Sequence, residues 1–209
     1  MEFARAMAAK YPDIKTTRGR LFAEVRFGES FKSRKEAAFI LCLLGYRRGF
    51  KTFTSMISEY EKHYLEEEGT WCYTDEKLFV CDLPLILGMM NTVEAHEELV
   101  RIVNNSRFPW LRAAALDGMA YEEDFLDIFF AMKVLKDEPE ALVRLSAMWV
   151  MLFNTYPNPG HERRRLMRKY IVPRLHDENN LVRQYALDIL AFEPSFANDI
   201  RSVLDHPDA

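Results

Sequence analysis

Three stretches of this chain can be aligned: residues 110–119 read WLRAAALDGM, residues 142–151 read LVRLSAMWVM, and residues 181–190 read LVRQYALDIL. Each has an arginine in third place, an alanine in sixth place and a large apolar residue in second, seventh and tenth place. These offsets put the apolar side chains on one face of an α-helix. The twelve residues of that face are Leu111, Ala115, Leu116, Met119, Val143, Ala147, Met148, Met151, Val182, Ala186, Leu187 and Leu190. The stretches predict three equivalent amphipathic helices.

The spacing of the three arginines, Arg112, Arg144 and Arg183, gives the length of an internal repeat. They are 32 and 39 residues apart, and acidic or turn residues precede the second and third of them, as expected before a helix. A second amphipathic segment follows each stretch; these segments cover residues 121–135, 163–175 and 196–204. The repeat unit is therefore expected to be a pair of helices about 32 to 40 residues long.

The residues Asp177, Val182, Arg183, Ala186 and Leu190 form a pattern that resembles the HEAT repeat, and the resemblance extends over roughly residues 75–205. It implies an all-α fold, a right-handed α-α superhelix of HEAT-like, armadillo-like helix pairs. It also implies that the repeat arginines are structural, each bound to a carboxylate or carbonyl of a neighbouring repeat. Such a pattern defines an architecture and no activity.

The whole chain, residues 1–209, is expected to form a single helical-repeat domain. Residues 1–74 are expected to be diverged N-terminal capping helices, because the repeat pattern fades upstream of residue 75. Helices are expected over residues 34–41, 50–67, 78–90 and 92–103. Residues 20–27 fit either a short helix or an alternating strand, and we expect the helix. Pro84 lies within one of these segments and requires either a kink or a late helix start.

Composition excludes several classes of protein. The chain is 49% hydrophobic and 29% charged, without a signal-peptide pattern or an apolar run of about 18 residues, so we expect a cytoplasmic protein with no membrane contact. Its cysteines, Cys42, Cys72 and Cys81, form no metal-binding or disulfide pattern. We expect no metal and no cofactor. The oligomeric state stays open.

Motifs for the common hydrolytic and phosphate-dependent activities are absent, and no catalytic residue is expected. Two His-Glu dipeptides, at His96 and His161, are similar to the iron-binding motifs of deoxyhypusine hydroxylase, a HEAT-repeat enzyme. That family has four such motifs followed by small residues, whereas these two are followed by Glu98 and by Arg163. We interpret both histidines as solvent-facing. A pigment lyase, another activity found on HEAT-like repeats, would direct attention to Cys72 or Cys81, but nothing in their spacing favours it.

An enzymatic alternative is a HEAT-like DNA glycosylase acting on alkylated bases. Trp110 and Asp117 are seven residues apart and would share a helix face, while the basic run from Arg163 to Lys169 would contact phosphate. The net charge argues against this alternative, because it is −11 over residues 51–140 and DNA binding needs a basic surface. Nucleic acid is therefore an unlikely partner. Trp149 is expected in the core.

The acidic middle of the chain suggests a different function. Aromatic residues accompany its carboxylates, and stacking of the repeats would bring two acidic groups together. The candidate partner-binding residues are Glu94, Glu97, Glu98, Tyr121, Glu122, Glu123, Asp124 and Asp127. Such a surface favours a basic protein partner. The sequence thus predicts a non-catalytic protein-protein interaction module, either an adaptor or an inhibitor comparable to a toxin-immunity protein.

Overall fold

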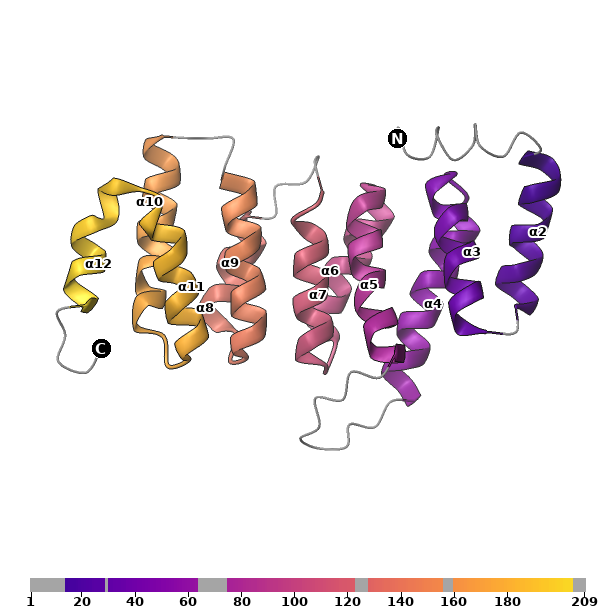
Figure 1. Cartoon of the computed structure of the whole chain (residues 1–209), viewed down its shortest axis with the longest axis horizontal. Coiled ribbons are helices and arrows are strands. Elements are labelled where there is room, and N and C mark those ends of the chain that lie inside the picture. Colours follow the sequence, from indigo (N-terminus) through magenta and orange to yellow (C-terminus); the bar gives the residue numbers. More distant parts are fainter. Residues whose placement is uncertain (1–13, 29, 64–74, 123–127, 156–159, 205–209) are drawn as a thin grey trace.

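The computed structural model describes residues 14–28, 30–63, 75–122, 128–155 and 160–204 (Figure 1). Over these ranges the chain forms 11 α-helices and two short 3-10 helices, with no strand, so the predicted all-α class is confirmed. The elements are α2 (Ile14–Phe27), α3 (Phe31–Leu43), α4 (Arg47–His63), α5 (Asp75–Met90), α6 (Val93–Asn105), α7 (Pro109–Met119), α8 (Ile128–Asp137), α9 (Ala141–Thr155), α10 (His161–Tyr170), η1 (Val172–His176), α11 (Asn180–Ala191), η2 (Pro194–Phe196) and α12 (Ala197–Leu204).

The helices form two layers (Figure 1). The front layer contains α3, α5, α7, α9 and α11, and α5, α7 and α9 pack side by side within it. The remaining long helices, α4, α6, α8 and α10, form the rear layer, with α4 packed on α3, α6 on α5 and α7, and α8 on α9. At the two ends of the molecule lie α2 and α12. Among the described helices none is long and apolar enough to cross a membrane.

The core includes the apolar face that the three aligned stretches predict. Eleven of the twelve aligned positions are buried, and the twelfth, Leu187 on α11, is half-buried. The three aligned alanines, Ala115, Ala147 and Ala186, have no exposed surface at all, which lets the neighbouring helices approach closely. The alignment therefore identified the buried side of α7, α9 and α11 correctly.

The helices α5 and α7 make their closest contact at two glycines. A methyl group added at Gly88 would collide with the backbone of Gly118, and one added at Gly118 would collide with the carbonyl of Pro84. Because neither glycine has a side chain, the two backbones touch directly. Pro84 lies well inside α5, which begins at Asp75, so a late start of this helix is excluded.

The predicted second helices differ from the structure in two places. Tyr121 and Glu122 were expected on a helix, but α7 ends at Met119 and both residues lie beyond that end. The amide N–H of Tyr121 donates to the carbonyl oxygen of Gly118, and the amide N–H of Glu122 donates to the carbonyl oxygen of Met119. The helix therefore ends in hydrogen bonds of the 3-10 type, which join residues three positions apart. The segment 163–175 divides at Ile171 into α10 and η1, which contains Pro173. The helix expected at 20–27 is confirmed as part of α2.

Candidate functional site

Two of the repeat arginines, Arg112 and Arg144, connect successive front helices through the loops that precede those helices. Each of the three repeat arginines donates a hydrogen bond from Nη1 to the carbonyl oxygen six residues earlier, at 2.9–3.1 Å. The second nitrogen, Nη2, reaches forward: that of Arg112 lies 2.8 Å from Glu138 Oε1, and that of Arg144 lies 2.7 Å from Asp177 Oδ1. We call this row of contacts at Arg112, Arg144 and Arg183 the arginine ladder. Its bonds to carbonyls and carboxylates of adjacent loops are those that the sequence predicts.

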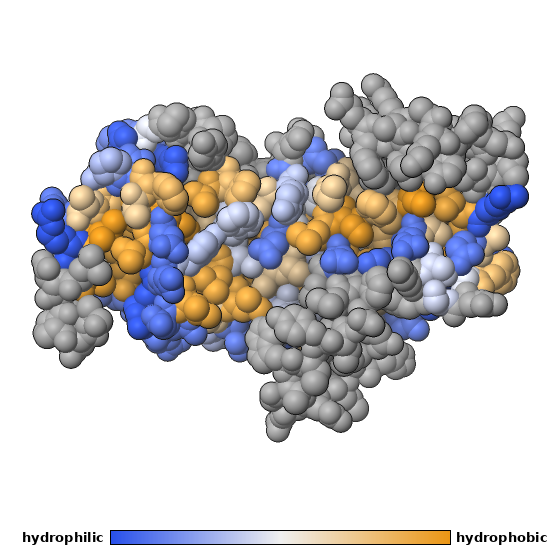
Figure 2. All heavy atoms as spheres, viewed as in Figure 1, coloured by the Kyte–Doolittle hydropathy of each residue, from blue (hydrophilic) through white to orange (hydrophobic). Residues whose placement is uncertain are grey.

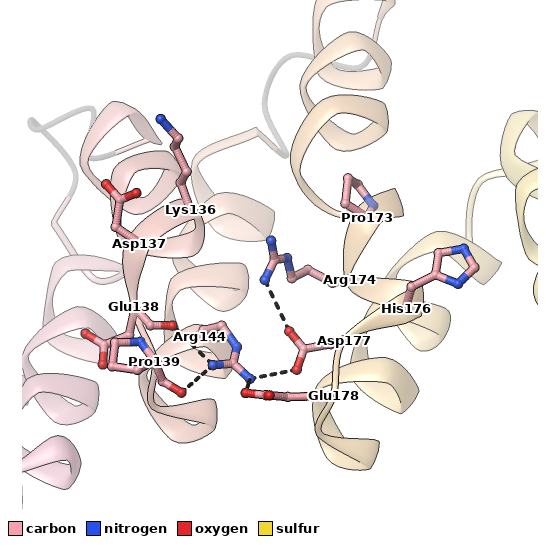
Figure 3. Close-up of a pocket in the computed structure, with 10 residues that line it drawn as sticks. All are labelled: Lys136, Asp137, Glu138, Pro139, Arg144, Pro173, Arg174, His176, Asp177 and Glu178. Carbon is pink, nitrogen blue, oxygen red and sulfur yellow. Dashed lines mark hydrogen bonds and ion pairs between the residues drawn. The ribbon is translucent and has the colours of Figure 1, made fainter.

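The best-formed contact of the arginine ladder surrounds Asp177 (Figure 3). Its side chain is only 2% exposed and accepts hydrogen bonds from Arg144, from Arg174 at 3.2 Å and from the backbone N–H of Asn179 at 3.0 Å. Burial opposes ionisation of Asp177, but the bond from Arg144 and the bond from Asn179 outweigh it and hold the pKa below its usual value. Asp177 and the two arginines pair with one another, so we assign this contact a structural role.

The predicted partner-binding carboxylates are not equally available on the surface. Glu94 and Glu97 are exposed on α6. Glu98 is mostly covered and accepts two hydrogen bonds from Arg101, at 2.8 and 2.9 Å. Tyr121 is exposed, whereas the structural description does not extend to Glu123, Asp124 or Asp127.

Glu122 is buried, in contrast to the expectation of a surface carboxylate. Its Oε2 lies 2.8 Å from Nδ1 of His96, and its side chain has no exposed surface. The interpretation of His96 as solvent-facing is therefore wrong, because this ring is mostly covered and holds a buried carboxylate. His161 is exposed, as expected. Reversing the charge of Glu122 would disrupt the fold and would not test partner binding.

A hollow of about 470 Å³ opens on the front layer between four helices. We call it the front hollow, and its lining residues are Leu85, Asp117, Tyr121, Leu145, Ser146, Trp149 and Tyr185. They come from α5, α7, α9 and α11 and from the turn after α7. The lining combines aromatic rings with one carboxylate and contains no positively charged side chain.

The environment of the front hollow alters two titratable groups. Burial raises the pKa of Asp117, and a hydrogen bond with Ser146 partly offsets this effect. The pKa of Tyr185 is raised to about 12, first by burial and then by the negative charges of Asp117 and Asp188. Both shifts are typical of a weakly hydrated, negatively charged surface. Such a surface favours a cation over an anion.

The tryptophans do not lie where the sequence suggested. Trp149 was expected in the core, but it is half-exposed in the front hollow, with its ring centre 4.4 Å from that of Phe153. Trp110 was expected to share a face with Asp117. Its ring instead packs edge-on against Tyr60 at 5.5 Å, and it does not line the hollow. The carboxylate of Asp117 is therefore accompanied by Trp149.

One signal in the alignment could have located this surface. Two residues beyond each aligned stretch stands an aromatic residue: Tyr121, Phe153 and Phe192. Their exposed fractions are 55%, 46% and 87%, values that are high for large apolar side chains. We call these three residues the aromatic stripe. In Figure 2, which shows the front layer, apolar side chains gather over α9 and α11 and again over α5 and α3.

The basic residues of α10 belong to a different surface. They line a second hollow, of about 390 Å³, that shares no residue with the front hollow; its lining residues are His161, Arg164, Arg165, Arg168, Lys169 and Ser195. Its arginines are paired with carboxylates: Arg165 with Glu162 at 2.6 Å, and Arg168 with Asp199 at 3.7 Å. Much of the positive charge is thus neutralised within the chain.

The described residues offer no alternative site of metal or thiol chemistry. In the ranges that the structure covers, no group of three or more His, Cys, Asp or Glu side chains is placed to hold a metal ion. Cys42 is buried, and burial raises the pKa of its thiol to about 12, which leaves it un-ionised at neutral pH. The side chains of Cys72 and Cys81 lie outside the described set.

Comparison of the chain with known protein families, with curated proteins and with solved structures gave no match. The observed geometry is that of an all-helical protein whose front layer presents aromatic rings and carboxylates. The ion pairs of Arg112 and Arg144 connect loops of the fold. The three rings of the aromatic stripe are exposed to solvent.

Proposed function

We propose that this chain is a non-catalytic protein-protein interaction module that binds a basic partner. In this proposal the helices form a right-handed superhelix of HEAT-like pairs. The regular arginine ladder supports such an arrangement, because it repeats the same contact at Arg112 and Arg144. A repeat architecture of this kind offers an extended surface, which suits a partner better than a small substrate.

The observation that carries the proposal is the aromatic stripe. Large apolar side chains are usually withdrawn from water, yet Tyr121, Phe153 and Phe192 are exposed at the same place in three successive front helices or just beyond their ends. Aromatic residues of this kind supply the anchors of protein interfaces. Their regular spacing fits a partner that lies along the front layer.

The charge of the surface suggests the nature of the partner. Asp117 and Asp188 lie one turn before two members of the aromatic stripe, and no cation lines the front hollow. Complementary charge speeds association and selects a basic partner. An adaptor, or an inhibitor that covers a basic enzyme as toxin-immunity proteins do, would use such a surface. The exposed Glu94 and Glu97 of the rear layer add negative charge but no anchor.

The experiment compares captures of partner proteins from a native-host lysate at low salt and at about 0.5 M salt. The double variant Tyr121→Ser and Phe192→Ser removes two exposed rings of the front layer. Phe129→Ser removes an equally exposed ring from α8 of the rear layer and is the matched control. We expect wild type and control to retain a basic protein that the double variant loses. Equal recovery by all three proteins, at unchanged thermal stability, would contradict the proposal.

A DNA glycosylase is the second candidate, and the raised pKa of Asp117 beside Trp149 is the observation that favours it. The basic residues of α10 line a separate hollow and are paired with carboxylates, which weakens the case for phosphate binding next to Asp117. Binding of duplex DNA with a steep salt dependence, and release of alkylated bases that Asp117→Asn abolishes, would establish this activity.

A further inference from the structure

The front hollow contains one carboxylate among rings and apolar side chains. Asp117, on α7, lines it together with Tyr121, Trp149 and Tyr185, and Leu85 and Leu145 complete the apolar part of the lining. Ser146, itself buried, lines the hollow beside Asp117, and its hydroxyl lowers the pKa of this carboxylate against the larger effect of burial. None of the lining residues offers a positive charge to balance it.

A poorly hydrated carboxylate needs both a positive charge and N–H donors from its ligand. A quaternary ammonium group has the charge and would fit aromatic rings, but it has no N–H to give. A lysine ammonium has donors, yet it is compact, strongly hydrated and not planar. A guanidinium group meets all the requirements, because it pairs with a carboxylate through two N–H groups and stacks its flat face on an aromatic ring.

We propose that the front hollow binds an arginine side chain of the partner protein. Its guanidinium group pairs with the carboxylate of Asp117 and stacks on the rings of Trp149 and Tyr185. Asp188, exposed on α11 close enough to act on Tyr185, adds to the negative potential. This inference rests on the proposed function, since it requires a protein partner on the front layer.

The test uses a defined probe and the full chain. N-acetyl-arginine methylamide is titrated to about 50 mM while the indole N–H signal of Trp149 is followed by nitrogen-15 NMR. That signal is assigned by its loss in Trp149→Phe. The matched neutral probe is the citrulline analogue, which has almost the same shape but no charge. We expect a saturable shift with the arginine probe and binding at least about tenfold weaker with the citrulline probe.

The variant Asp117→Asn keeps the shape of the side chain and removes its charge. We expect it to bind the arginine and citrulline probes equally, whereas Glu59→Gln, which changes an exposed carboxylate on α4, keeps the full preference. The inference is overturned if wild type does not distinguish the two probes, if Asp117→Asn retains the preference, or if no saturable shift occurs. Tighter binding of a trimethyl-lysine probe would also overturn it.

The two proposals can fail separately. If the probes show no preference for arginine but partner capture still depends on Tyr121 and Phe192, the interaction surface stands and the arginine pocket does not. If capture does not depend on those rings, the proposed function falls, and specific binding of the arginine probe would then indicate a small-ligand site.

Discussion

Two aspartates of this chain are only partly hydrated but have opposite electrostatic surroundings. Asp177 accepts hydrogen bonds from two arginines, and its pKa is lowered. Asp117 lies beside the hydroxyl of Ser146 and pairs with no cation among the described residues, and its pKa is raised. An ion-paired carboxylate stabilises the fold, whereas a desolvated carboxylate without a counter-charge destabilises it in its ionised form. This contrast separates the structural carboxylate from the one that is free to serve a ligand.

Asp117→Asn is expected to stabilise the protein at neutral pH. A carboxyl group whose pKa is higher in the folded chain than its ordinary value of 3.8 costs stability once the pH rises above that value. The gain should therefore be largest near pH 7 and fade as the pH falls toward about 4. Urea unfolding of both proteins over this pH range measures it. A loss of stability, or a gain independent of pH, would contradict the prediction.

Arg144→Ala is expected to be strongly destabilising. It leaves the buried carboxylate of Asp177 without its nearest partner, at a cost of about 3 kcal/mol in the free energy of unfolding. Arg183→Ala is the control, because Arg183 makes similar bonds to backbone carbonyls and pairs with no carboxylate among the described residues. That variant should lose about 1 kcal/mol. Similar losses in the two variants would show that the carboxylate pairing adds nothing.

At the scale of the helices, the contact between α5 and α7 depends on the absence of side chains. Gly118→Ala places a methyl group against the carbonyl of Pro84, and we expect a loss of about 2 kcal/mol or more. Gly19→Ala is the matched substitution, since the space around Gly19 on α2 is open and alanine favours a helix. Denaturant unfolding should show opposite signs for the two variants. Equal effects would mean that the two backbones can separate at little cost.

The sequence predicted the front helices well because their buried faces obey one periodic rule. Positions such as Ala147 and Met151 face neighbouring helices, so their chemistry is restricted to apolar residues. It predicted the connections poorly. The buried carboxylate of Glu122 meets His96, a partner 26 residues away, and no local pattern contains that information. A charged residue in a polar run gives no sign that it will be covered.

The candidate site could be predicted only in part for a related reason. The aromatic stripe recurs with the same period as the repeat and can be seen in the alignment. Its exposure to solvent is what distinguishes it from core residues. That exposure depends on how the two layers of helices pack, which the alignment does not show. The front hollow needs four helices in place before Asp117, Trp149 and Tyr185 meet. Composition indicated an acidic, aromatic surface; the arrangement of the layers decides which acidic and aromatic residues belong to it.

On the scale of the whole molecule, the arginine ladder has a direction, since Arg112 and Arg144 each reach toward the loop of the following front helix. At Arg183 the described chain supplies no such loop, and Nη2 has only the Asn180 Oδ1 contact at 3.5 Å. Leu187 is half-buried and Leu181 exposed on the same helix. Local opening should therefore be easiest at α11 and hardest at α7 and α9.

Amide hydrogen exchange measures this gradient of protection directly, and uniform rates along the front helices would refute it. The gradient also bears on recognition, because Tyr185 of α11 forms one wall of the front hollow. A wall that opens transiently can adjust to an incoming side chain and close over it. Occupation of the hollow should then slow exchange most in α11, so that the least protected front helix becomes the most sensitive reporter of a bound partner.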